Sequence, residues 1–308
     1  MSRYFLRRLL LVIPVLIGVS VFTFILFYIV PGDPVLIMVG ERASPETVAR
    51  LRAELGLDQP LPIQYLNWIG KAVRGDLGRS FITGRSIAES IQTRFPVTVR
   101  LSLYSMLFAI VLGIPAGIWA ATHKGTWIDG VIRNVSLLGV CTPVIFQGLA
   151  MQYIFGVWLR WLPVSGLNDG SWRDFLMPAF VLGTGIAAYQ ARLVRAVMLE
   201  VLGEEFIRTA RAKGLSERLV VYRHALRNAL IPIVTTLGGS LSSLLVGSAL
   251  TETIFALPGI GSYTLDAVFA RDLPVIMAMF VFQAVVFAAA NLLIDAAYAL
   301  IDPRVRYE

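Results

Sequence analysis

The chain has 308 residues, of which 56% are hydrophobic and 15% charged, and its mean hydropathy is +0.72. Soluble domains usually carry about 25% charged residues, so the composition excludes an ordinary soluble protein and indicates a membrane protein. The net charge of +7 does not require a nucleic-acid partner, because basic residues flank membrane helices on the cytoplasmic side.

Six apolar segments are long enough to cross a bilayer, whose core needs about 20 apolar residues per helix. They lie at residues 9–30, 100–122, 131–160, 176–198, 229–252 and 274–300. The first resembles a signal peptide, since Arg3, Arg7 and Arg8 precede it, but its 22 uncharged residues exceed a signal core of roughly 7–15. We therefore expect a retained helix, and a single all-α membrane domain over residues 1–308 with about six transmembrane helices.

The distribution of basic residues predicts the orientation. With a cytoplasmic N-terminus, 15 of the 27 Lys and Arg residues fall in inside segments, and only Arg160, Arg173 and Arg271 fall in the short outside loops. This asymmetry places both termini in the cytoplasm.

Residues 31–97 form a long external segment that contains start and stop signals for helices. Ser44 is an N-cap with Pro45 at the first helical position, and the helix ends at Gly56. Pro62 starts a second helix, and a third begins at Ser86 and stops before Pro96. We expect a helical insertion on the periplasmic side after the first membrane helix.

No pattern for catalysis or for metal binding is found. The single Gly-Lys pair, Gly70-Lys71, has Tyr65 where a Walker A loop needs its first glycine. His123 and His224 fall in predicted cytoplasmic loops, and Cys141 is the single cysteine. We expect no catalytic residue, no metal and no cofactor on this chain.

The inside loop, residues 200–228, reads as two short helices joined at Gly214, which suits the left-handed position that ends a helix. Phe206, Ile207 and Ala210 are expected on one face of the first helix. Two interpretations remain open at this point. The loop is either a solvated basic connection or an amphipathic helix that enters a groove on a cytoplasmic partner.

The segment Arg208-Thr209-Ala210-Arg211-Ala212-Lys213-Gly214 resembles the EAA loop of ABC importer permeases, in the dipeptide, oligopeptide and glutathione branch. Arg208 and Thr209 replace the Glu and first Ala of the general consensus, and Pro232 lies further from Gly214 than usual. The other similar stretches are Pro31–Pro34, Leu55–Leu61, Gly75–Gly78, Arg223–Ala229, Glu252–Gly261 and Arg271–Pro274. The resemblance covers nearly the whole chain.

This resemblance implies a type I ABC importer permease that moves peptides across a bacterial or archaeal cytoplasmic membrane by alternating access. It implies a second similar permease, two ATPase subunits that hold ATP and Mg²⁺, and an external substrate-binding protein that docks on residues 31–96 and 254–274. It assigns ATPase coupling to Glu204, Phe206, Ile207, Arg208, Thr209, Ala210, Arg211, Ala212, Lys213, Gly214 and Leu215.

Polar and small residues in the spans are the candidates for a transport pathway. Gly239, Ser243 and Gly247 recur every four residues, a spacing that serves either close helix packing or a pathway wall. Asp295 is ionisable at membrane depth and is expected to pair with Arg192 or Arg195. The remaining candidates are Gln147, Tyr189, Gln190 and Asn291.

Two other functions were compared with transport driven by ATP. A secondary transporter or channel needs no ATPase partner, but the chain lacks repeated halves and charges deep in most spans. A membrane scaffold needs no pathway. The cargo stays open among dipeptides, longer peptides, glutathione, nickel complexes and haem.

Overall fold

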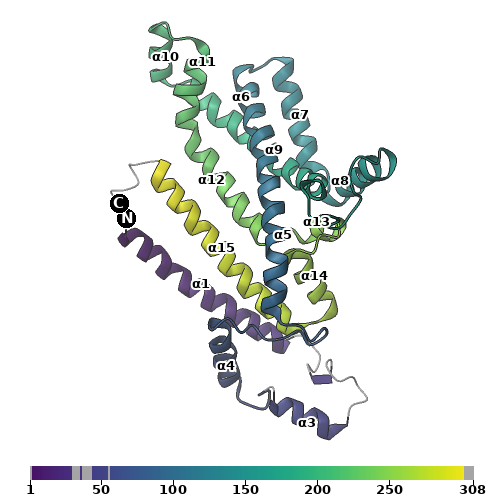
Figure 1. Ribbon diagram of the computed structural model, residues 1–308. Helices are drawn as coiled ribbons and strands as arrows, with labels where there is room; N and C mark the ends of the chain where they lie inside the picture. Colours follow the sequence, from purple (N-terminus) through teal and green to yellow (C-terminus); the bar gives the residue numbers. More distant parts are fainter. Residues whose placement is uncertain (1, 30–34, 37–43, 55, 302–308) are drawn as a thin grey trace.

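The computed structural model describes residues 2–29, 35–36, 44–54 and 56–301 (Figure 1). The described residues contain helices and no named strand, which confirms the all-α class. The helices are α1 (Ser2–Ile29), α3 (Pro45–Glu54), α4 (Leu61–Val73), α5 (Ile87–Phe108), α6 (Ile114–Thr122), α7 (Trp127–Cys141), α8 (Val144–Met151), α9 (Trp172–Leu202), α10 (Glu205–Ala212), α11 (Glu217–Leu219), α12 (Leu226–Leu245), α13 (Ala249–Ile254), α14 (Ile260–Ala270) and α15 (Leu273–Ile301), with π-helical turns at Ala109–Gly113, Gln152–Trp158 and Val220–Ala225.

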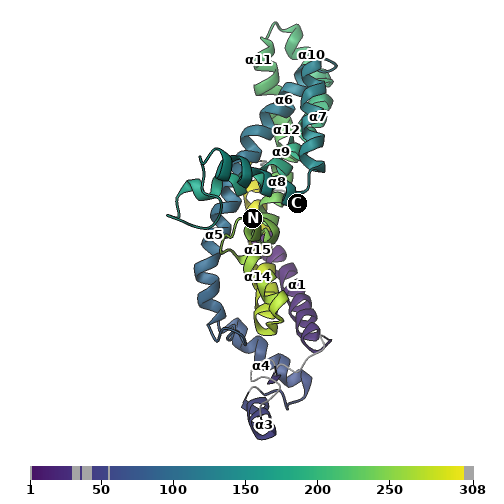
Figure 2. The same ribbon diagram turned by 90° about the vertical axis from the view of Figure 1, so that its right-hand side faces the viewer.

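The molecule is elongated, and its two ends carry different loops. The short helices α10 and α11 lie at one end, beyond α6 and α7, and α3 and α4 lie at the other (Figures 1 and 2). The long helices α1, α5, α9, α12 and α15 run between them. The 200–228 loop and the external insertion are therefore at opposite ends.

The helix α9 is the centre of the bundle and contacts α5, α6, α7 and α12. Glycines allow this close approach. A Cβ built on Gly117 of α6 would lie 2.5 Å from the Val194 Cβ, and one on Gly183 of α9 would lie 2.8 Å from the Phe108 Cβ. Because neighbouring helices cover α9, it tolerates polar residues that a lipid-facing helix does not.

The second predicted span begins earlier than expected. We predicted a helix stop before Pro96, but the helix is continuous from Ile87 to Thr122, over 36 residues, with Pro96 inside it. Proline removes one backbone hydrogen bond, and side chains packed on both flanks, such as Ile91 and Val97, are buried and hold the helix together.

The third predicted span is broken at Pro143, where we expected an uninterrupted helix. The two halves, Trp127–Cys141 and Val144–Trp158, meet at an angle of 98°. Thr142 is extended, with ψ 123°, as expected for a residue before proline. The fifth span ends at Leu245, and the rest of the predicted segment forms the separate helix α13.

Three described helices are long and apolar enough to span a membrane: Ile87–Thr122, Glu217–Leu245 and Leu273–Ala296. The bent pair around Pro143 makes a fourth if it is one span, and the apolar part of α1, Leu10–Leu26, is shorter. The fourth predicted span, residues 176–198, lies in α9, which has 31 residues and the enclosed position described above. The sixth predicted span, residues 274–300, lies in α15.

In the 31–97 segment the predicted helix starts and the turn at Gly56 are confirmed. The Ser44 Oγ accepts a hydrogen bond from the Thr47 N–H at 3.3 Å, and Gly56 has φ +69° just after α3. Pro62 stands at the start of α4, and the Ser86 Oγ accepts from the Glu89 N–H at 3.5 Å. The segment Pro31–Pro34 quoted above lies outside the described residues.

Candidate functional site

The 200–228 loop folds into two short helices as predicted. Gly214 has φ +76° between α10 and α11. Arg211 closes the turn by donating two hydrogen bonds to the Glu217 carboxylate, at 3.1 and 2.6 Å. This carboxylate also raises the pKa of Arg211 above its usual value.

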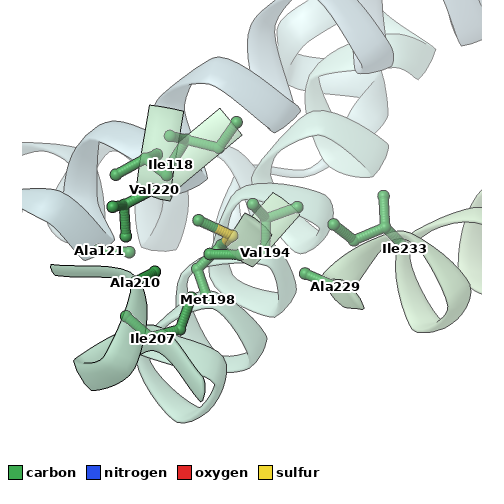
Figure 3. Close-up of a cluster of buried hydrophobic side chains, with 11 residues drawn as sticks. Ile118, Ala121, Val194, Met198, Ile207, Ala210, Val220, Ala229 and Ile233 are labelled. Atoms are coloured by element: carbon green, nitrogen blue, oxygen red, sulfur yellow. The ribbon is translucent and has the colours of Figure 1, made fainter. Parts of the chain in front are cut away.

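One side of α10 is packed against the body of the chain. Ile207 and Ala210 are buried, and Figure 3 shows them facing side chains of α6, α9 and the Val220–Ala225 turn. The cluster comprises Ile118, Ala121, Val194, Met198, Ile207, Ala210, Val220, Val221, Ala225, Ala229 and Ile233. Buried apolar contacts of this kind fix α10 to the apolar cluster that α6, α9, α12 and the Val220–Ala225 turn share.

The side of α10 next to this packed side is exposed in the part of the chain that the structure describes. Phe206 is 43% exposed, so the expectation that it shares the face of Ile207 and Ala210 is wrong. Successive helical residues point about 100° apart, which lets Phe206, Thr209 and Lys213 form an outward face. Of the other predicted coupling residues, Glu204, Arg208, Arg211, Ala212 and Gly214 are exposed, and Leu215 is half-buried against the cluster.

A cavity of about 480 Å³ opens on the surface between α9 and α12. Its wall contains three of the predicted pathway residues, Tyr189, Gly239 and Ser243. A Cβ built on Gly239 meets no atom within 4 Å, so this glycine does not serve close packing within the chain. The other lining residues are Leu182, Ile186, Thr236, Ser240, Leu244 and Ser248.

Other predicted pathway residues lie outside this cavity wall. Gln190 is fully buried, donates to the Ile233 carbonyl at 3.0 Å and accepts from the Thr236 hydroxyl at 3.0 Å, so it joins α9 to α12. Gln147 donates to the Thr142 carbonyl at 3.1 Å across the break in the third span. Gly247, at φ +111°, is in close contact with the Gly261 backbone.

On α15, Asn291 accepts a hydrogen bond from the Ser242 hydroxyl at 3.4 Å, and the half-buried Asp295 lies one turn further along. Arg195, which we expected to pair with Asp295, instead forms a two-pronged pair with Asp129 of α7, with N–O distances of 2.6 and 2.8 Å. Asp129 is buried and also accepts from the Gly125 N–H at 3.1 Å. The pair therefore fixes the α6–α7 turn to α9.

A buried carboxyl group at the other end of the bundle was missed as a structural centre. Glu252 is fully buried, and its oxygens accept from the Thr98 hydroxyl at 3.0 Å and from the Ser262 N–H at 2.8 Å. The same Thr98 hydroxyl accepts from the Ile260 N–H at 2.9 Å. Glu252 and Thr98 thus cap the N-terminus of α14, where Gly259 has no side chain to do so.

A second contact joins one of the motifs quoted above, Arg271–Pro274, to the loop that follows another, Gly75–Gly78. Asp272, just before α15, accepts from the Ser80 hydroxyl at 2.5 Å and from the Phe81 N–H at 3.1 Å. It holds the loop after Gly75–Gly78 on the start of α15. Asp272 belongs to the Arg271–Pro274 stretch and Ser80 follows Gly75–Gly78 by two positions, so the contact brings these two parts of the chain together.

The sequence matches two family descriptions that together cover almost all of the chain. Residues 113–307 match "Binding-protein-dependent transport system inner membrane component", and residues 1–102 match the N-terminal part of the same kind of membrane component. The chain belongs to this family of permeases. The predicted resemblance is thereby confirmed. Membership of this family favours the ABC permease interpretation over a secondary transporter or channel.

Curated relatives of this permease match it from end to end. The glutathione transport system permease protein GsiC of Escherichia coli is 41% identical over 308 residues, covering 100% of both chains. The dipeptide transport system permease protein DppB of Alkalihalophilus pseudofirmus is 39% identical over 333 residues, again covering 100% of both.

Solved structures share the fold. An inward-facing structure of the MetNI methionine ABC transporter matches with a TM-score of 0.57 and 19% identity, covering 69% of this chain and 96% of that one. The likeness supports the type I permease fold predicted for this multi-pass inner-membrane protein.

Proposed function

We propose that this permease is the transmembrane subunit of an ATP-driven importer of peptides, with di- and oligopeptides or glutathione-like molecules as cargo. The cargo class rests on relatives that are named glutathione and dipeptide transport permeases. The chain itself hydrolyses nothing. Two separate ATPase subunits hold ATP and Mg²⁺, and an external binding protein delivers the peptide.

The rigid attachment of α10 is the observation that carries this proposal. A coupling element has to convert movement of an ATPase into movement of membrane helices, which a flexible loop does poorly. Ile207 and Ala210 place α10 in one apolar cluster with residues of α6, α9 and α12, while the neighbouring Phe206 is 43% exposed in the described structure. The exposed ring is suited to a groove on an ATPase.

The open cavity between α9 and α12 supports a pathway shared between two permeases. Its wall mixes apolar residues with Tyr189, Thr236 and several serines, which offer hydrogen bonds to a peptide backbone. One side of the cavity is open, and a second permease facing it completes the wall. Alternating access then consists of a tilt of the two subunits that exposes this cavity first outward and then inward.

The proposed location is a bacterial or archaeal cytoplasmic membrane, with both termini and α10 on the cytoplasmic side. The helices α3 and α4, at the opposite end of the molecule, then lie outside. The binding protein docks there, on residues 31–96 and 254–274.

Replacing Phe206→Asp tests the coupling role. The chain is co-expressed with its genomic neighbours, and the ATPase that co-purifies with it is measured together with the unfolding temperature. We expect a loss of bound ATPase of about 10-fold or more, because a charge buried in an apolar groove costs several kcal/mol. The unfolding temperature should not change, since the side chain is exposed.

Ile82→Asp is the matched control, because Ile82 is also exposed (51%) but lies in the loop after α4. It should leave ATPase binding at the wild-type level. Unchanged ATPase binding in Phe206→Asp contradicts the docking role of this face. If no ATPase co-purifies with the wild-type chain, the importer proposal itself fails.

A further inference from the structure

The helix α4 has an apolar face that nothing in the described chain covers. Leu66 is 64% exposed and Val73 is 82% exposed. Pro62 lies on the same side of the helix, since the three positions fall within about 40° of one another at 100° per residue. A solvent-facing helix would not normally carry such a patch.

The other sides of α4 are occupied. Tyr65 and Trp68 pack on Phe24 of α1, with ring centroids 5.4 and 6.3 Å apart, and the Tyr65 hydroxyl is 2.8 Å from the Ser20 hydroxyl. Ser20 and Phe24 are buried by this contact. The aromatic cluster fixes α4 across the end of α1 (Figure 1), so its free face has a defined direction.

The polar side of α4 is also accounted for. Gln64 donates to the Gln59 carbonyl at 2.6 Å, and Asn67 donates to the Gln59 side chain at 3.0 Å. These residues line a cavity of mixed polarity of about 620 Å³, together with Lys71 and Arg74, and Leu66 and Trp68 reach its edge. Gln64, Asn67 and Lys71 therefore lie about 100° or more around the helix from Leu66, so the hydrogen-bonding side chains and the exposed apolar side chains are on different sides of α4.

The apolar surface is continuous with the membrane-facing side of α1. A groove of about 320 Å³ runs between the two helices, and every residue that lines it is apolar or aromatic: Val21, Phe24, Ile25, Ile29, Leu61, Pro62 and Tyr65. Along α1, Ile17, Val21, Ile25 and Ile29 form one exposed stripe at intervals of four residues. The stripe is apolar along its whole length, and its end at Val21, Ile25 and Ile29 forms one wall of the groove.

We propose that α4 is an interfacial helix whose free apolar face lies in the outer leaflet, and that a phospholipid acyl chain occupies the groove between α1 and α4. The aromatic rings of Tyr65 and Trp68 sit at the headgroup level, where such rings are enriched. Lys71 and Arg74, both exposed, are placed to attract an anionic headgroup. The choice of the outer leaflet rests on the orientation proposed above. The proposed contact of α4 with lipid does not depend on that orientation.

Lipid contact has a consequence for the mechanism. The helix is tied to α1 by the aromatic cluster, and α1 packs along α15, whose start holds the Ser80 loop through Asp272. A helix held at the surface of the bilayer keeps this part of the external segment at a constant depth.

Fluorescence quenching by lipid tests the proposal on the full-length chain. The exposed Cys141 is first replaced by serine, and single cysteines are then introduced as Leu66→Cys, Val73→Cys and, as a control on the polar side, Asn67→Cys. Each is labelled with a small environment-sensitive dye and reconstituted, with its co-purified subunits, in liposomes of phosphatidylcholine brominated near the headgroup.

We expect a loss of fluorescence about twofold or more greater at Leu66 and Val73 than at Asn67, because an interfacial helix sits about 5–10 Å into the headgroup and acyl boundary. Weak quenching at all three positions places the helix in water and overturns the proposal. Equal strong quenching at all three also overturns it, since no polar side then exists. Protection of Leu66 and Val73 by added binding protein, without lipid quenching, assigns the face to a protein partner. None of these measurements depends on whether the reconstituted protein transports a substrate.

Discussion

Replacement of Glu252 is the most direct test of how α13 and α14 are held against α5. Its two oxygens accept hydrogen bonds from Thr98, from the Ser248 N–H at 3.3 Å and from Ser262. Thr98 and Glu252 come from α5 and α13 and lie 154 positions apart in the sequence. Loss of this group therefore loosens α13 and α14 from α5 together.

The size of the effect follows from the donors that are left unpaired. Glu252→Gln keeps the length of the side chain but turns one accepting oxygen into an NH₂ group, so at least one buried N–H loses its acceptor, at a cost of about 1–3 kcal/mol. Thr98→Val leaves the Ile260 N–H unpaired and should cost a similar amount. Glu252→Ala removes every acceptor and opens a cavity, so we expect about 3 kcal/mol or more.

Thermal unfolding of the purified chain in detergent, followed by tryptophan fluorescence, measures this order. We expect wild type to be the most stable, then Glu252→Gln and Thr98→Val together, and then Glu252→Ala. Glu89→Gln changes an exposed carboxylate on α5 and should lie within about 0.5 kcal/mol of wild type. If Glu252→Gln unfolds at the wild-type temperature, the carboxyl group does not hold these helices and the reasoning is refuted.

Two further predictions concern the packing of α9. Gly117→Ala places a Cβ 2.5 Å from a side-chain carbon of α9, so it should lower stability by about 1–3 kcal/mol and reduce bound ATPase, because α6 supports α10. Gly185→Ala is the control: its Cβ meets no atom within 4 Å, so the variant should be neutral or slightly stabilising. Equal unfolding temperatures of the two variants would contradict the packing argument. Asp129→Asn removes the charge that faces Arg195 and should lower stability by about 1–3 kcal/mol. In the same unfolding assay, the double variant with Arg195→Gln should recover part of that loss. Strictly additive losses of stability in the two single variants would show that the pair does not act as a unit.

Local features could be read from the sequence because each depends on neighbouring residues alone. The cap at Ser44 with Pro45, the turn at Gly56 and the left-handed position of Gly214 are decided by side chains or by φ within a few residues. The apolar segments likewise mark the spans, since the bilayer requires a minimum apolar length. Motifs quoted along the chain led to the correct family.

The same residue type had different effects in different surroundings, which sequence did not resolve. Pro96 lies inside a continuous helix, while Pro143 ends one and produces a bend of 98°. A proline removes the same hydrogen bond in both places, and only the packing around it decides whether the helix continues. The spacing of apolar residues likewise predicted that Phe206 and Ile207 lie on one face of a helix. It did not show which of the two side chains packs on the core of the chain.

The contacts that hold the candidate sites together come from the tertiary structure alone. Thr98 with Glu252, Ser80 with Asp272 and Asp129 with Arg195 pair residues that lie far apart in the sequence. Propensity and spacing act over a few residues, so they predict which helices form. Which helix lies beside which, and therefore which buried polar group finds its partner, is decided only when the bundle packs.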